Sequence, residues 1–307
     1  MPALARRIAE RDSGFVLFAL TPPRQSTPAD RLTEIAGATR DRLSRLALDG
    51  LVLYDIDDEG ERNPTERPFP FSPTIDPSEY RSAHLADWPT PVVVYRAVGK
   101  YTRAELTAWA AAQDAERTVT VMVGAATSGV TPAVRLSEAQ AICVVANPRL
   151  LLGGVAIPER HSRRHDEHLR LIDKQAAGCS FFVTQIVFDL NAAKNLVSDY
   201  RYECLSRVVD PVPIVFTVSV CGSMRTLEFL RWLGVEVPRW IENDLEHASD
   251  PLAESSEQAF ATALELAAFC RRLDVPFGIN VESVSIRRAE IEAAVDLADR
   301  LIRGLRQ

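Results

Sequence analysis

The sequence lacks an excess of basic residues and any long apolar run. Its 307 residues contain 35 Lys and Arg against 42 Asp and Glu, a formal net charge of −7. Because phosphate neutralisation needs a basic face, this balance argues against general nucleic-acid binding. No run of about 18 apolar residues occurs, and the N-terminus has no signal-peptide pattern, so neither a membrane span nor secretion is expected.

Paired cysteines are also missing. The five cysteines are dispersed and form no CxxC pair. An odd, scattered set fits buried thiols in a reducing compartment better than a disulfide framework. Apolar residues make up 47% of the chain and charged residues 25%, which is typical of an ordinary globular protein. These features predict a cytoplasmic globular protein.

Short apolar runs alternate with longer amphipathic segments along the chain. Eight runs are almost continuously apolar, as expected for parallel strands covered on both faces. Eight strands alternating with helices predict an α/β fold, a (β/α)8 TIM barrel that forms a single domain over residues 1–307. The expected strands are 15–20, 50–54, 92–95, 119–123, 150–156, 181–187, 214–218 and 276–281.

The segments between these runs have helical patterns. The expected helices are 28–47, 103–115, 135–141, 166–177, 191–204, 223–233, 254–273 and 285–305. A doubly wound open sheet is the alternative fold, but no GxGxxG follows the first strand, which weakens a dinucleotide-binding fold. Residues 55–80 are rich in proline and acidic residues and are expected to form a long loop, either solvated or part of the site.

The densest polar cluster extends from Pro158 to His168, after the fifth expected strand. His161, His165 and His168 are spaced i, i+4 and i+7, so they would share a helix face if all three were helical. Three imidazoles could bind zinc, but the neighbouring arginines would repel a dication, so no metal is expected. The pattern favours an anion site at a helix start, with a solvated charged helix as the alternative.

Polar side chains also stand at the ends of other expected strands. Gln185 interrupts an apolar strand, and an unpaired buried amide costs about 1–3 kcal/mol. It is therefore either a satisfied core amide or a ligand contact. A ring of polar groups is expected at the C-terminal face of the barrel, formed by Tyr54, Asp55, Tyr95, Arg96, Asn280 and Glu282.

With these segments in place, the chain resembles the methylenetetrahydrofolate reductase family of flavin-binding (β/α)8 barrels. The similarity is strongest in the middle third, which contains Pro158-Glu159-Arg160-His161, Lys174-Gln175-Ala176-Ala177-Gly178 and Thr184-Gln185 with Asp189. The segment Phe18-Ala19-Leu20-Thr21-Pro22-Pro23-Arg24 is similar to the family's Phe-Glu-Phe-Phe-Pro-Pro-Arg.

The resemblance implies a cofactor and its contacts. In this family FAD takes hydride from NADH or NADPH and passes it to the folate. The resemblance places Gln185 beside the flavin and the bound folate or nicotinamide. Residues that would hold FAD are Ile157, His161, Glu167, Arg170 and Lys174, and further candidates at the strand ends are Tyr54, Tyr95, Arg96, Gly124 and Ala125.

Two carboxylates of the family are missing. The first-strand glutamate is Ala19, and the aspartate after the fourth strand is Ala125. Since a methyl group cannot deliver a proton, and losing a general acid costs roughly 10²–10⁴-fold, three explanations stay open. Ala19 is an engineered substitution, or another substrate such as an imine is reduced with Asp55, Asp57 or Glu282 as the proton source, or the protein is a non-catalytic relative.

The sequence thus predicts a flavin-dependent oxidoreductase that moves hydride from NAD(P)H through FAD to the C=N bond of a folate or related imine. The candidate catalytic residues are Gln185, Asp55 and Glu282, and Ala19 marks the missing family glutamate. The expected partners are the small-molecule substrate and further copies of the chain in a homo-oligomer, not nucleic acid or membrane. The alternatives are a non-catalytic or regulatory flavin- or folate-binding relative, and flavin-free direct hydride transfer from NADH.

Overall fold

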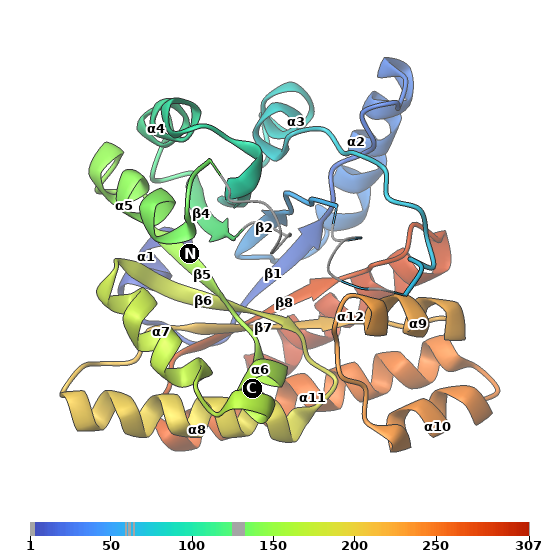
Figure 1. Cartoon of the computed structure of the whole chain (residues 1–307). Helices are drawn as coiled ribbons and strands as arrows, with labels where there is room; N and C mark the ends of the chain where they lie inside the picture. The colour runs from blue at the N-terminus through green and yellow to red at the C-terminus, as the bar shows by residue number, and fades with distance from the viewer. Residues whose placement is uncertain (1–3, 59, 61–62, 64, 125–132, 307) are drawn as a thin grey trace.

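All eight expected strands are present, and they close into one barrel. The strands are β1 (Phe15–Leu20), β2 (Gly50–Leu53), β3 (Val92–Ala97), β4 (Thr118–Val123), β5 (Leu152–Ala156), β6 (Cys179–Ile186), β7 (Ile214–Ser219) and β8 (Phe277–Glu282). The computed structural model describes residues 4–306 apart from 59, 61, 62, 64 and 125–132. Each strand pairs in parallel with the next along the chain, and β8 pairs with β1, which confirms the (β/α)8 barrel and excludes the open sheet (Figure 1).

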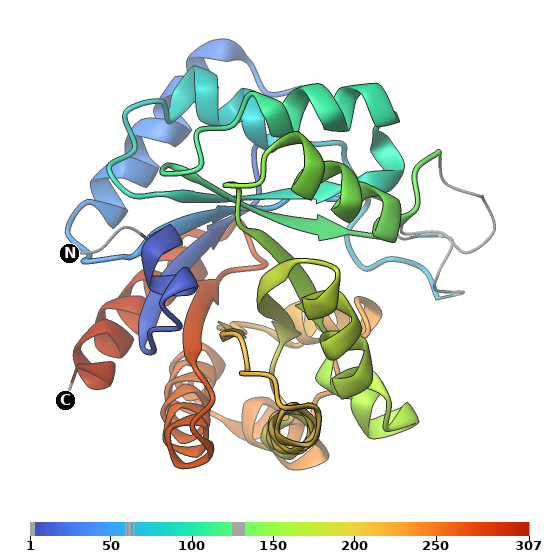
Figure 2. The same ribbon diagram turned by 90° about the vertical axis from the view of Figure 1, so that its left-hand side faces the viewer.

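Helices cover the barrel from outside, except the first, whose Leu4 and Ile8 pack against the residues of the barrel interior. They are α1 (Leu4–Ala9), α2 (Ala29–Leu43), α3 (Pro77–His84), α4 (Arg103–Ala111), α5 (Leu136–Ala146), α6 (Pro158–Arg164), α7 (Glu167–Ala176), α8 (Leu190–Arg207), α9 (Met224–Trp232), α10 (Arg239–His247), α11 (Pro251–Leu273) and α12 (Arg288–Leu305), with a 3₁₀ turn, η2 (Val98–Lys100). In Figure 2 the helices that follow β1 to β4 lie above the strands, and those that follow β5 to β8 lie below. Within the described part of the chain, no helix is both long and apolar enough to cross a membrane.

Four helices are not among those that the sequence predicts: α1, α3, α6 and α10. The N-terminus of α3 has a clear local cause, because the Asp76 carboxylate accepts bonds from two backbone N–H groups and Pro77 occupies the first turn. The proline-rich surroundings conceal this signal. α6 is separated from α7 because His165 adopts a left-handed conformation, with φ of 54°, which ends the first helix.

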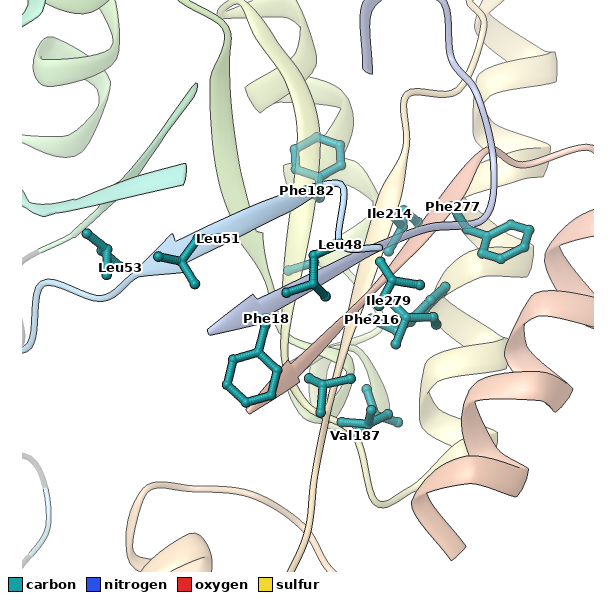
Figure 3. Packing of buried hydrophobic residues seen from close by; sticks show 14 of the residues in the cluster. Phe18, Leu48, Leu51, Leu53, Phe182, Val187, Ile214, Phe216, Phe277 and Ile279 are labelled. Atoms are coloured by element: carbon teal, nitrogen blue, oxygen red, sulfur yellow. The ribbon is translucent and has the colours of Figure 1, made fainter. Parts of the chain in front are cut away.

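Alternate strand residues face opposite sides of the barrel wall and build two apolar layers. Residues such as Phe15, Val93 and Phe181 fill the barrel interior. Their neighbours along the strands pack against the helices, and Figure 3 shows Phe18 and Phe182 in this outer layer. The period of two in side-chain direction therefore decides which polar residue faces the barrel mouth and which faces the helices.

Gly278 in β8 makes room for an aromatic ring inside the barrel. A Cβ atom at this position would lie 2.4 Å from the Phe15 ring. We expect Gly278→Ala to lower the free energy of unfolding by about 1–3 kcal/mol, because the ring must move within a packed interior. Urea unfolding measures the change. Gly37→Ala is the matched control, since a Cβ there meets nothing within 4 Å and helix α2 should gain about 0.5–1 kcal/mol. Equal effects of the two substitutions would contradict this packing argument.

Candidate functional site

A connected polar network occupies the mouth of the barrel, toward the C-terminal ends of β2, β3, β7 and β8. The Tyr54 hydroxyl donates a short hydrogen bond to the Glu282 carboxylate. Asn280 Nδ2 donates to the Tyr54 hydroxyl at 2.9 Å and lies 3.3 Å from Thr217 Oγ1. The Tyr95 ring meets the Tyr54 ring edge to face, with 4.8 Å between centroids. These side chains come from four strands and fix one another's positions.

Glu282 is the carboxyl group of this network. Burial raises its pKa to about 7, and the hydrogen bond from Tyr54 opposes that rise. Burial and the neighbouring Glu282 carboxylate hold the pKa of Tyr54 well above its usual value. The tyrosine therefore stays protonated and acts as a donor, while Glu282 can exchange a proton near neutral pH.

Ala19 lies directly beside this carboxyl group. The sheet register pairs Ala19 of β1 with Glu282 of β8. Ala19 belongs to the inward-facing layer and is buried. A carboxyl group thus stands one strand away from the position at which the resemblance implies a missing glutamate.

Gln185 lies near the end of β6 and is half-buried. Its Nε2 donates to the carbonyl of Leu233 at 2.9 Å, where helix α9 ends. The amide is therefore satisfied by the protein and approaches the loop after α9. Within the described part of the chain, no hydrogen bond connects Gln185 to the Tyr54 network.

Asp55 and Arg96, expected in the ring at the mouth, instead turn toward the helices. Asp55 accepts from the backbone N–H of Ala97 at 2.9 Å, from Tyr101 at 2.7 Å and from Lys100 at 2.5 Å. Arg96 donates to Asp76 at 2.5 Å and lies over the rings of Tyr101 and Trp109.

The expectation that both residues complete the ring is wrong. Their neighbours Tyr54 and Tyr95 take the inward positions, so the alternation of the strands sends these two outward.

The helix start after β5 holds a self-contained charge cluster around Glu167. This buried carboxylate accepts from the Ile157 backbone N–H at 3.2 Å and from Arg160 at 2.9 Å. Lys174 lies 3.9 Å from it and donates to the Val155 carbonyl at 2.5 Å. Arg170 is 4.0 Å away and more exposed. Burial lowers the pKa of Lys174, which the Glu167 carboxylate opposes.

These contacts test whether the residues fit FAD. Two implied contacts are closed to solvent, since Glu167 is 0% and His161 1% exposed. Lys174 is mostly buried and already bonded. Because these side chains already bind protein groups, they do not fit the FAD diphosphate in this arrangement. Gly124 follows β4 and is half-buried, and Ala125 lies outside the described residues.

The three histidines do not share one helix face, because they do not all lie in one helix. The break at His165 divides the segment, and His165 is exposed. His161 is buried in α6, with Nε2 2.9 Å from Asp199 Oδ2 of helix α8. His168 lies in the first turn of α7, and its ring centroid is 5.2 Å from that of His161. Asp199 is distant in sequence and has no motif around it, so no local signal could have found it.

Comparison with known proteins defines the class of this barrel. A family model described as methylenetetrahydrofolate reductase matches residues 138–275. A solved structure of an uncharacterised protein from Clostridium thermocellum, which binds two copies of 5-methyl-5,6,7,8-tetrahydrofolic acid, is 42% identical. The similarity covers 98% of this chain and 99% of that chain, with a TM-score of 0.85.

The chain belongs to the methylenetetrahydrofolate reductase family. Membership in this family suggests an oxidoreductase. A GH10 xylanase from Thermobacillus composti, 12% identical with a TM-score of 0.50 over 96% of this chain and 98% of that chain, shares the fold alone. No functionally curated protein matches the chain.

Proposed function

We propose that the protein is a reductase of methylenetetrahydrofolate or a closely related folate, with Glu282 as its proton donor. Family membership supports the reaction class. The folate bound by the Clostridium thermocellum relative supports the substrate class. The observation that carries the proposal is the buried Glu282 carboxyl group, which has a pKa of about 7 beside Ala19 in the barrel mouth.

The proposed chemistry needs one proton and one hydride. Glu282 protonates the departing ring nitrogen as its bond to the methylene carbon breaks, which leaves an iminium cation. Hydride from the reduced nicotinamide adds to that carbon, and the nicotinamide leaves oxidised. Solvent then returns a proton to Glu282. The Oδ1 atom of Asn280, buried without a hydrogen-bond partner among the described residues, is a candidate acceptor for an N–H of the substrate.

The route of the hydride has two candidates, NADH or NADPH directly and the family's relay through FAD. The buried Glu167 and His161 favour direct transfer, because the side chains that would hold FAD engage the protein instead. The five cysteines are all free and buried, which supports the proposed reducing, cytoplasmic location.

A visible spectrum and an anaerobic turnover assay test this proposal together. We expect the purified protein to show no flavin absorption and to oxidise NADH or NADPH in the presence of methylenetetrahydrofolate without added FAD. If the protein contains bound flavin that bleaches when NADH is added, the hydride passes through FAD and is not transferred directly. Folate binding without any nicotinamide oxidation would support the non-catalytic alternative and overturn the proposal.

Tyr54→Phe should shift the pH dependence of turnover. The lost hydrogen bond stabilises the ionised form of Glu282, so its pKa should rise and the fall in kcat above neutral pH should move about one pH unit higher. Tyr95→Phe is the control, because Tyr95 touches the Tyr54 ring. A kcat profile that shifts equally in both variants would count against the assignment of Glu282.

A further inference from the structure

Three side chains that can ligate a metal converge among the helices outside the barrel wall. They are His161 of α6, His168 of α7 and Asp199 of α8. One ligand atom from each lies within 4.8 Å of the other two. The two imidazole rings are 5.2 Å apart and almost perpendicular, at 85°. They come together because the chain breaks at His165 and turns the second histidine back toward the first.

We propose that His161, His168 and Asp199 form a binding site for Zn²⁺ that ties α6, α7 and α8 together. Two imidazoles and one carboxylate are a ligand set that zinc accepts, with water completing the tetrahedron. This site is separate from the proposed reductase chemistry and does not depend on it.

The spacing suits this ion. Zinc bonds of about 2.0–2.2 Å place tetrahedral ligand atoms about 3.3 Å apart, so the three atoms need to approach by at most about 1.5 Å. His161 Nε2 and Asp199 Oδ2 are already 2.9 Å apart. The side chains of His168 and Asp199 are only partly covered, so rotation of these two can provide the remaining movement.

An unsatisfied imidazole nitrogen supports a ligand at this position. The Nδ1 atom of His168 is buried and has no hydrogen-bond partner among the described residues. An orphaned buried polar atom is costly, and most such atoms in proteins have a partner or bind a ligand. The Asp199 side chain is 51% exposed, which gives the ion a path from solvent and leaves room for a bound water.

The neighbouring arginines do not oppose a cation as the sequence suggests. Arg160 pairs with Glu167 at 2.9 Å, and Arg163 lies 3.5 Å from Glu236. Their charges are therefore compensated by carboxylates of their own. Arg164 is exposed, where water and salt screen its charge.

Zinc titration of the full-length, tag-free protein after chelator treatment tests the proposal. Competition with a chromogenic chelator should give about one zinc ion per chain, and Co²⁺ should produce the visible absorption of a tetrahedral site. His168→Gln and Asp199→Asn should each weaken zinc binding by roughly 100-fold, since loss of even an outer-sphere partner costs 10–100-fold.

His247→Gln is the matched control, because His247 is exposed at the end of α10 and lies outside the ligand set. It should keep the affinity of the unmodified chain. Circular dichroism should show all three variants folded, since none of these side chains is fully buried. Absence of zinc binding by the unmodified protein, or equal affinity in His168→Gln, Asp199→Asn and His247→Gln, would overturn the site.

Discussion

Glu282→Gln is expected to lower kcat by roughly 10²–10⁴-fold, the usual effect of losing a general acid. Glutamine keeps the shape of the side chain but cannot give up a proton. Substrate binding should change far less, because the remainder of the mouth, including Tyr54 and Asn280, stays in place. Stopped-flow oxidation of NADH or NADPH with methylenetetrahydrofolate measures the effect. A kcat within a few-fold of that of the unmodified protein would remove Glu282 from the chemistry.

The pH dependence of kcat is a second test of Glu282 as the general acid. An acid must be protonated to act, so kcat of the unmodified protein should fall as pH rises through about 7, the raised pKa of Glu282. The residual activity of Glu282→Gln should lack that fall. A flat profile in the unmodified protein would show that another group supplies the proton.

Glu159→Gln is a matched control for the same chemistry. Burial also raises the pKa of Glu159 to about 7, but this residue lies in α6, outside the network at the mouth. Both glutamates bind their proton more tightly in the folded state than in the unfolded state. The free energy of unfolding should therefore fall as pH rises from about 4.5 to 7. Each substitution by glutamine should reduce this pH-dependent loss of stability by up to about 3 kcal/mol. Only Glu282→Gln should reduce kcat.

A further test moves the carboxyl group from Glu282 to its register partner, Ala19. Because Ala19 and Glu282 are register partners, Ala19→Glu in the Glu282→Gln background places a carboxyl group one strand away. We expect at least about a tenfold recovery of kcat, since a general acid is present again. Ala19→Glu alone should give no comparable gain, because the two carboxyl groups would then repel one another.

The strands and the barrel could be predicted because burial on both faces leaves continuous apolar runs in the sequence. The relation between Ala19 and Glu282 could not, since these residues lie near opposite ends of the chain and meet only when β8 closes against β1. Glu282 is a candidate proton source in the sequence, but no local pattern places it beside Ala19, where the family glutamate is missing. Register and closure are properties of the whole sheet.

Side-chain direction is the other limit of the sequence. Arg96 follows Tyr95, and period two alone sends one of them outward, but which one depends on the packing of neighbouring strands. The histidine segment shows a different limit. The spacing of the histidines suits one helix face, but a single left-handed residue, His165, changes the direction of the chain between them.

Glu167→Ala is expected to lower the free energy of unfolding by about 3–5 kcal/mol. The carboxylate is fully buried and compensates Arg160, at 2.9 Å, and Lys174, at 3.9 Å. Removing one partner of a buried ion pair leaves uncompensated charge in the protein, which costs far more than the pair itself contributes. The pKa of Lys174 should fall further, because burial already lowers it and the Glu167 carboxylate that opposes this effect would be gone. Urea unfolding at neutral pH measures the loss.

The same substitution separates a structural role from a cofactor contact. If Glu167 held FAD, its loss would weaken flavin binding and leave the stability of the flavin-free protein nearly unchanged. Asp166→Asn is the control, because Asp166 is the neighbour of Glu167 in the chain and its carboxylate is half-exposed. The Asp166 carboxylate lies 3.4 Å from Arg170, and such a pair is worth at most about 1 kcal/mol. The result would contradict this structural role if Glu167→Ala lost no more stability than Asp166→Asn and also bound FAD more weakly. It would then indicate that the cluster contacts FAD and that the hydride passes through the flavin.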